Sequence, residues 1–174
     1  MKNSFIIIAE NGVQDEEIIY PYYRLSENEN LQILIASSTE EIKCKEGVLI
    51  KRHISIEEID SYTDQLVGIL IPGGFESPEK LRQNKKVLEL VKSVKLNEGL
   101  VTAICHGVWV LISAGIMEKV HSTCYPGMKD DLINAGANYE DLPAIEDSNT
   151  ITGRRPRDLS IFMKLVISAL KNRE

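Results

Sequence analysis

Short, wholly apolar runs alternate along the chain with segments in which apolar residues recur every three or four positions. A wholly apolar run suits a strand that is buried on both faces of a parallel sheet. The spaced segments suit amphipathic helices that cover such a sheet. The predicted strands are 4–9, 31–36, 66–71, 100–104, 142–146 and 150–152, with a small hairpin over 42–45 and 48–52. The predicted helices are 15–25, one turn at 56–59, a short helix within 75–84, and 85–96, 108–114, 126–135 and 158–170.

This alternation predicts an α/β fold with a mostly parallel sheet covered by helices on both faces. The 174 residues contain no internal repeat and no linker, so we expect one domain spanning 1–174. In open sheets of this kind, sites lie beyond the carboxyl ends of the strands. Three such ends carry polar residues or glycines, namely 10–15, 72–79 and the pair Cys105-His106. We expect these segments to meet at one rim of the sheet.

Composition narrows the class of protein. The formal net charge of −6 and the lack of a long basic run argue against nucleic-acid binding. No apolar stretch approaches the roughly 20 residues of a membrane span, and the start lacks a signal-peptide pattern, so a cytoplasmic protein is expected. Three cysteines and three scattered histidines give neither a disulfide framework nor a metal-ligand spacing, and no metal site is expected.

The segment Cys105-His106-Gly107 lies between a predicted buried strand and a predicted apolar helix. A cysteine on such a turn presents its sulfur at the rim, where the positive helix end favours the thiolate. Glycine at position 107 is expected to let the backbone turn sharply. The alternative is a small buried hydrophobe, as many free cysteines are. The imidazole of His106 either serves as a general base or takes no part, leaving only its backbone amide in use.

Several segments resemble the PfpI family of intracellular cysteine peptidases. They read I-P-G-G, P-E-K-L-R-Q-N, A-I-C-H-G-V-W-V-L-I-S-A-G, Y-P-G-M-K-D-D-L-I-N-A-G-A and T-G-R-R-P-R-D-L. That family belongs to the superfamily of the Parkinsonism-associated protein deglycase and the class I glutamine amidotransferases. The resemblance implies a flavodoxin-like three-layer sandwich that assembles into dimers, trimers or hexamers. It implies peptidase, deglycase, chaperone-like or glyoxalase activity, the last without an added cofactor.

The resemblance also implies roles for single residues. Cys105 matches the family nucleophile, and His106 matches its neighbouring histidine. Glu79 matches an acid that an adjacent subunit lends to that histidine, and Tyr125 matches a tyrosine lining the pocket. A one-residue difference before Pro78 makes the match of Glu79 less direct.

The turn formed by Gly73 and Gly74 offers freely placed backbone amides. It lacks the spacing of a phosphate-binding loop, so an oxyanion hole is the better interpretation. By resemblance, that hole consists of Gly74 and the amide of His106.

The loop after the first strand differs from the family pattern. The family usually has Gly-Phe-Glu-Asp there, with a glutamate whose carboxyl touches the sulfur, whereas this chain has Gly-Val-Gln-Asp over 12–15. We therefore expect Gln14 to lie against Cys105 and to weaken acid–base turnover, because an amide donates a hydrogen bond but exchanges no proton at neutral pH. Glu10 and Asp15 are expected to be solvated charges or helix caps.

Two classes of function follow. The preferred one is a cysteine-dependent hydrolase acting on peptides or on glyoxal-derived adducts. The alternative is a stress-related chaperone or redox-sensing protein with little turnover, in which Cys105 becomes oxidised. A glutaminase subunit is disfavoured, since it needs a later His-x-Glu pair and no histidine follows His121.

Overall fold

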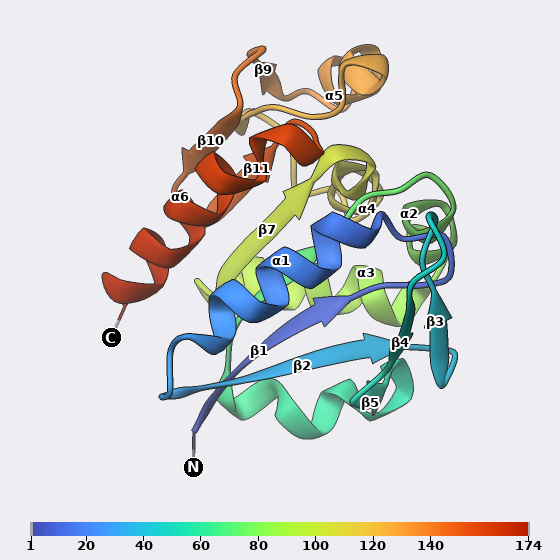
Figure 1. Cartoon of the computed structure of the whole chain (residues 1–174). Coiled ribbons are helices and arrows are strands. Elements are labelled where there is room, and N and C mark those ends of the chain that lie inside the picture. Colours follow the sequence, from blue (N-terminus) through green and yellow to red (C-terminus); the bar gives the residue numbers. More distant parts are fainter. Residues whose placement is uncertain (1, 174) are drawn as a thin grey trace.

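The computed structural model describes residues 2–173 and contains a central sheet of seven strands in the order β10-β11-β7-β6-β1-β2-β5. All neighbouring strands are parallel except β10, which runs antiparallel to β11 at one edge. Figure 1 shows the sheet between two layers of helices. The predicted α/β sandwich is therefore confirmed.

The strands agree closely with the apolar runs. Those of the central sheet are β1 (Asn3–Ile8), β2 (Leu31–Ser37), β5 (Ile54–Ser55), β6 (Leu66–Ile71), β7 (Leu100–Ile104), β10 (Ala144–Asp147) and β11 (Thr150–Gly153). Two small sheets lie outside it, the predicted hairpin β3 (Glu41–Lys43) with β4 (Leu49–Lys51), and β8 (His121–Ser122) with β9 (Asn138–Tyr139). The two-residue strands β5, β8 and β9 are too short to leave a pattern in the sequence.

The helices also follow the prediction. The α-helices are α1 (Asp15–Ser26), α2 (Glu76–Leu81), α3 (Lys85–Leu96), α4 (Val108–Ser113), α5 (Lys129–Asn134) and α6 (Leu159–Lys171). The 3-10 helices are η1 (Ile56–Gln65), η2 (Cys105–Gly107), η3 (Pro126–Met128) and η4 (Pro156–Asp158). Pro21 lies inside α1, as expected from the sequence.

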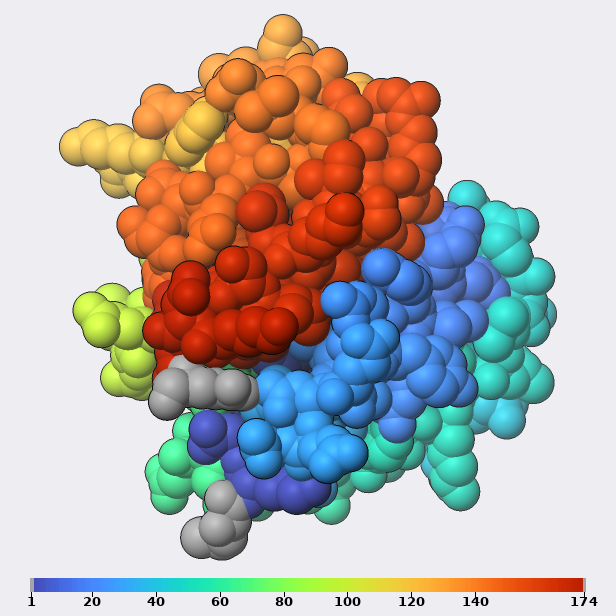
Figure 2. All heavy atoms as spheres, turned by 60° about the vertical axis from the view of Figure 1, so that its left-hand side comes forward, coloured from blue at the N-terminus to red at the C-terminus, as the bar shows by residue number. Residues whose placement is uncertain are grey.

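Successive residues of each strand enter opposite cores, as the period of two requires. Ile6 and Ile8 of β1 pack with η1, α3 and α4, whereas Phe5 and Ile7 pack with α1 and α6. Figure 2 shows α6 beside α1 on the outer surface of the second layer. Strands that are buried on both faces therefore read as continuous apolar runs.

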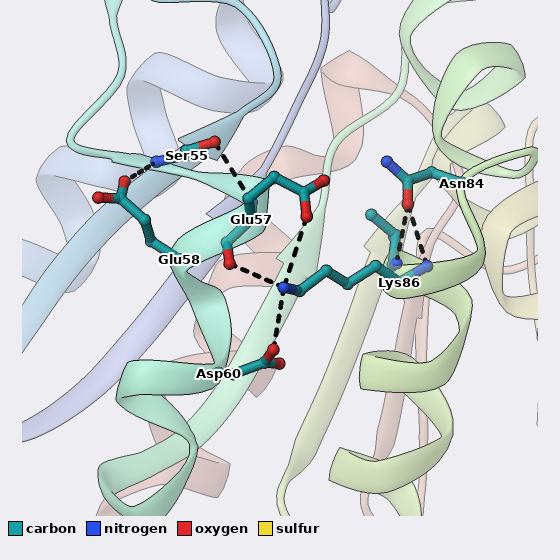
Figure 3. Close-up of polar contacts among 7 residues, drawn as sticks. Ser55, Glu57, Glu58, Asp60, Asn84 and Lys86 are labelled. Atoms are coloured by element: carbon teal, nitrogen blue, oxygen red, sulfur yellow. Dashed lines mark hydrogen bonds and ion pairs between the residues drawn. The ribbon is translucent and has the colours of Figure 1, made fainter.

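The helical segment after β5 is longer than the single turn predicted. Ser55 and Glu58 form a capping box at its start, and Asn84 caps α3 by accepting from the amides of Lys86 and Val87. Lys86 then reaches across to η1, where its ammonium group lies 2.9 Å from Asp60 (Figure 3). These polar contacts hold η1 against α3. The apolar pattern of 56–59 alone did not indicate them, so the prediction stopped after one turn.

The order of the strands brings the predicted site segments together. Strands β7, β6 and β1 are direct neighbours and parallel, so the residues after them lie side by side at the carboxyl rim. The prediction that three distant segments meet at one rim is confirmed. Within residues 2–173, no helix is both long and apolar enough to cross a membrane.

Candidate active site

Cys105 occupies a strained turn between β7 and α4. Its φ of 59° is left-handed, which costs a non-glycine residue about 1–2 kcal/mol. The following Gly107 has an ordinary φ of −55°. A Cβ atom on Gly107 would lie 2.2 Å from the carbonyl oxygen of Ile71, so glycine is required there for close approach. The expectation that glycine makes the sharp turn is wrong, because the cysteine itself adopts that conformation.

A buried carboxyl group lies against the sulfur, and it belongs to Glu17. This residue is in the first turn of α1 and has no exposed surface. One of its oxygens accepts a 2.6 Å hydrogen bond from the amide of Gly73, and Cys105 lies beside it, since a Cβ atom on Gly73 would be 2.4 Å from that oxygen and 2.7 Å from the Cβ of Cys105. Its other carboxyl oxygen, Oε1, is buried without a hydrogen-bond partner from the described residues. An acid of this kind is placed to exchange a proton with the sulfur or with a bound substrate.

Gln14 does not take this position, and the prediction that it replaces the acid is wrong. Its side chain is partly exposed, donates to Glu16 at 2.7 Å and accepts from Lys45 at 3.3 Å. The acid comes three residues later in the chain than expected. A signal was present in the sequence, because Glu17, Pro21 and Leu25 are four residues apart and share the buried face of α1.

Burial raises the pKa of the Glu17 carboxyl to about 8, despite the opposing hydrogen bonds from Gly73 and Cys105. The cause is the cost of removing a carboxylate from water. At neutral pH the group is therefore predominantly protonated. A protonated carboxyl donates a hydrogen bond and carries a proton that can be transferred.

The same burial raises the pKa of the Cys105 thiol, and a negative charge on Glu17 raises it further. The backbone amides of His106 and Gly74 hydrogen-bond the sulfur and act in the opposite direction. Desolvation therefore opposes the thiolate that the helix end was expected to favour. When Glu17 is protonated its repulsion disappears, so the protonated pair favours transient ionisation of the sulfur.

The glycine turn supplies these amides. Gly73 uses its amide to hold Glu17, and Gly74 directs its own amide at the sulfur. Gly74 has a φ of 80°, and a Cβ atom on it would lie 2.3 Å from the carbonyl oxygen of Gly12. Two amide donors, from Gly74 and His106, therefore converge on the position of the sulfur. Gly73 itself is a positioning residue.

The imidazole of His106 reaches the sulfur, with Nδ1 3.4 Å from Sγ of Cys105. Its ring stacks on Tyr125, with the ring centroids 4.5 Å apart. It makes edge contacts with Trp109 and Phe75, whose ring centroids lie 5.0 and 5.8 Å away. Burial lowers the pKa of His106, so the ring is neutral at neutral pH and able to accept a proton. The role of Tyr125 in lining a pocket stays a prediction, and the contacts of Phe75 and Trp109 with His106 were not predicted.

Glu79 lies on α2 and contacts Gln83 within the chain, with its carboxylate 3.4 Å from the amide nitrogen. The same nitrogen donates to the Glu79 carbonyl oxygen at 2.9 Å. A contact between Glu79 and the His106 of an adjacent subunit remains a prediction.

Two other acids of the rim are structural. Glu10 is buried and accepts from the amide of Ser38 at 2.9 Å and the hydroxyl of Ser37 at 3.2 Å. Asp15 is also buried and accepts from two amides of the β3–β4 turn. The expectation that they are solvated charges or helix caps is therefore wrong, because both anchor loops.

The remaining cysteines and histidines make ordinary structural contacts. Cys44 and Cys124 are buried, and burial raises the pKa of both thiols. His53 accepts from the amide of Ile35, and His121 lies 2.7 Å from a carboxylate oxygen of Glu140. Across residues 2–173, no cluster of three or more histidine, cysteine or acidic side chains is suited to a metal ion.

The site can be compared with known proteins. A sequence profile of the DJ-1/PfpI family matches residues 3–169. The chain belongs to the DJ-1/PfpI family. Over 167 residues it is 35% identical to the deglycase PfpI of Pyrococcus furiosus, covering 95% of this chain and 98% of that relative. It is 37% identical over 131 residues to YraA of Bacillus subtilis, named as a candidate cysteine protease, covering 75% and 76% of the two chains.

Solved structures agree with this family assignment. A two-domain protein from Anabaena variabilis with DJ-1/ThiJ/PfpI-like and ferritin-like domains superposes with a TM-score of 0.91 and 31% identity. The match covers 98% of this chain and 48% of that one, so this chain spans about half of the two-domain protein. DJ-1 of Schizosaccharomyces pombe superposes with a TM-score of 0.88 at 21% identity, over 95% and 90% of the two chains, which supports the flavodoxin-like fold.

Proposed function

We propose that this DJ-1/PfpI protein is a cysteine-dependent hydrolase that acts on glyoxal-derived adducts or on peptides. Cys105 is the nucleophile, His106 the general base and Glu17 the general acid. The observation that carries the proposal is the buried Glu17 carboxyl, which lies beside Cys105 and has its pKa raised to about 8. The naming of the Pyrococcus furiosus relative as a deglycase supports the adduct class.

The first step is addition of the sulfur to a carbonyl carbon. The thiol proton passes to Nδ1 of His106, which is neutral and lies 3.4 Å from the sulfur. A carbon–sulfur bond forms, and the carbonyl oxygen takes the electron pair of the broken π bond. The amides of Gly74 and His106, which converge on the sulfur, are suited to hold that oxyanion.

The second step needs an acid. For an amide substrate, the imidazolium of His106 gives its proton to the amine nitrogen as the carbon–nitrogen bond breaks, and the oxyanion re-forms the carbonyl group of a thioester. His106 then takes a proton from water, whose oxygen attacks the thioester, and the carbon–sulfur bond breaks to release the carboxylic acid. Glu17, protonated at neutral pH, gives its proton to the departing sulfur and is reprotonated from solvent as the imidazolium of His106 releases its own proton.

The alternative of a chaperone or redox sensor with little turnover was favoured by the supposed loss of the acid. Glu17 removes that support, because a proton carrier contacts the sulfur. Turnover is therefore the stronger proposal for this chain.

We also propose that the active form is a homo-oligomer in which Glu79 of one copy orients His106 of another. The exposed side chain of Phe75, 58% accessible, lies beside His106 at the start of α2, the helix that carries Glu79. Sedimentation together with Glu79→Gln kinetics tests this proposal. A monomer with full activity contradicts it.

The main experiment compares Cys105→Ala, Glu17→Gln and the matched control Glu16→Gln on methylglyoxal, on its adduct with N-acetylarginine and on a fluorogenic peptide. Glu16 is the exposed neighbour of Glu17. We expect loss of turnover in Cys105→Ala, a loss of about 100-fold or more in Glu17→Gln, and little change in the control.

Gln14→Glu extends the comparison, since it restores the residue expected from the family pattern. Its side chain faces Lys45 rather than the sulfur, so turnover of the uncharged substrate methylglyoxal is expected to stay within about twofold of wild type. Wild-type turnover in Cys105→Ala, or equal losses in Glu16→Gln and Glu17→Gln, contradicts the proposed function.

A further inference from the structure

The hairpin β3–β4 is fastened to the loop that follows β1. The amide of Lys43 donates to the side-chain oxygen of Asn11 at 2.7 Å, and its carbonyl accepts from the amide of Gly12 at 2.9 Å. The amide of Lys45 donates to the carbonyl of Val13 at 2.8 Å. These bonds place Lys45 beside the loop that enters α1.

The turn of this hairpin is fixed as well. The buried Asp15 accepts from the amides of Glu46 and Val48 at 2.8 and 3.1 Å. The amide of Gln14 in turn donates to the carbonyl of Gly73, in the turn that supplies the active-site amides. The backbone of Lys45 is therefore connected to the site through a short series of hydrogen bonds.

The ammonium group of Lys45 keeps capacity for another partner. It donates to the side chain of Gln14 at 3.3 Å and lies 3.5 Å from the carboxylate of Glu46. The Lys45 side chain is 55% exposed and that of Glu46 64%, so their ion pair is weak. An ammonium group has three donors, and an arriving anion can compete for them.

A cleft of about 400 Å³ lies between Lys45 and Phe75. Phe75, at one end, contacts the ring of His106 at 5.8 Å. The acid in the cleft, Glu76, pairs with Lys80 at 3.6 Å, which leaves the lysines of the hairpin as the excess charge. The lining residues are Asn11, Gly12, Lys43, Cys44, Lys45, Phe75 and Glu76.

The positive charge of Lys45 affects the pKa values of His106 and Glu17. Burial is the main reason that the pKa of His106 is lowered, and the Lys45 cation lowers it further. The same cation opposes the rise that burial causes in the pKa of Glu17. The protonated Glu17 does not cancel this positive field, and the exposed carboxylate of Glu16, which accepts from Gln14 at 2.7 Å, opposes it.

We propose that Lys45, tethered by Gln14, is a specificity-determining residue that binds a carboxylate next to the carbon attacked by Cys105. The substrate class is thus carbonyl compounds or adducts that bear a carboxylate beside the reacting carbon. This inference rests on the proposed function, since it assigns the charge of that function's substrate. It gives Gln14 a positioning role in place of the one that the sequence suggested.

The test measures alkylation of Cys105 by iodoacetate and by iodoacetamide, two reagents of similar size that differ in charge. In both reactions the sulfur displaces iodide, and peptide mass analysis separates Cys105 from Cys44 and Cys124. The readout is the ratio of the iodoacetate rate to the iodoacetamide rate. A change in the ionisation of Cys105 affects both rates and cancels in the ratio.

Lys45→Met is expected to lower this ratio by about three- to tenfold, as loss of one charge near the reagent implies. Gln14→Leu is expected to give a smaller decrease in the same direction. The matched control is Lys51→Met, on the same hairpin, where the lysine pairs with Glu40 and faces solvent. It changes the net charge equally and should leave the ratio unchanged. The wild-type ratio is expected to fall with added salt.

The outcomes separate the two proposals. Equal ratios in wild type and Lys45→Met, or equal decreases in Lys45→Met and Lys51→Met, overturn the role of Lys45 while leaving the proposed function intact. A decrease confined to Lys45→Met and Gln14→Leu supports it, even if no substrate tested is turned over. If neither reagent alkylates Cys105, the cleft does not open onto the nucleophile and both proposals fail.

Discussion

The carboxyl group of Glu17 and the side chain of Cys105 are buried side by side against Gly73, Glu17 with no exposed surface and Cys105 with 6%. Glu17 raises the pKa of Cys105, and Cys105 lowers the pKa of Glu17, so the two titrate as a pair. Glu17 is also held by the amide of Gly73, which fixes the carboxyl beside the sulfur. Most of the chemistry expected of this protein depends on where the protons of this pair reside.

Glu17 makes folding stability depend on pH. Its pKa is about 8 in the folded protein and 4.5 for an ordinary exposed glutamate, as in the unfolded chain, so between these values the folded state binds a proton that the unfolded state lacks. The contribution is complete below pH 4.5 and is lost as the pH rises toward 8, by at most about 1.4 kcal/mol per pH unit. Denaturant unfolding at pH 5, 6.5 and 8 measures this slope.

Glu17→Gln keeps the shape of the side chain and removes the titration. The free energy of unfolding of this variant is expected to fall less steeply over the same pH range than that of wild type. Glu16→Gln, an exposed neighbour, should retain the wild-type slope. Parallel slopes in wild type and Glu17→Gln would show that the buried carboxyl titrates normally.

The fluorescence of Trp109, the single tryptophan of the sequence, reports on His106 because the centroids of the two rings are 5.0 Å apart. Protonated imidazole quenches indole emission, so acidification should lower the fluorescence. The midpoint is expected below the usual histidine pKa of about 6.5, since burial lowers the pKa of His106. His106→Asn should abolish the transition, and its persistence in that variant would assign it to another group.

Gly107 is required because the turn at Cys105–Gly107 lies close to β6. An added Cβ would lie 2.2 Å from the carbonyl oxygen of Ile71, and backbone cannot move away as a side chain can. Gly107→Ala is expected to lose about 3 kcal/mol of stability, measured by denaturant unfolding. In the control Gly127→Ala, the new atom meets only the half-exposed ring of Tyr125, and the loss should stay below about 1 kcal/mol. Equal losses would contradict the steric explanation.

The layers and most elements of this fold could be predicted from the pattern of apolar residues. The stretches 66–71 and 85–96 coincide with β6 and α3, because burial on both faces or on one face imposes a period that the sequence displays. The strands β5, β8 and β9 have no such period. They form only because neighbouring segments offer them hydrogen-bond partners.

The nucleophile could also be predicted, because a buried strand, a cysteine and a glycine follow one another within a few residues. Glu17 was missed because it follows Asp15 and Glu16, and three acids in a first turn are typical of an exposed helix start. Only the helical phase separates the buried acid from its exposed neighbour. The contacts of His106 with Phe75, Trp109 and Tyr125 depend on how three separate segments pack, which no local pattern encodes.

The most direct test is the infrared absorption of the Glu17 carboxyl at neutral pH. The difference spectrum of wild type minus Glu17→Gln should contain the C=O stretch of a protonated carboxylic acid at pH 7. This band should disappear as the pH rises through about 8, and it should be absent from the difference spectrum of wild type minus Glu16→Gln. A carboxylate band alone at pH 7, with the acid band appearing only near pH 4.5, would contradict the account of Glu17 as the proton carrier beside Cys105.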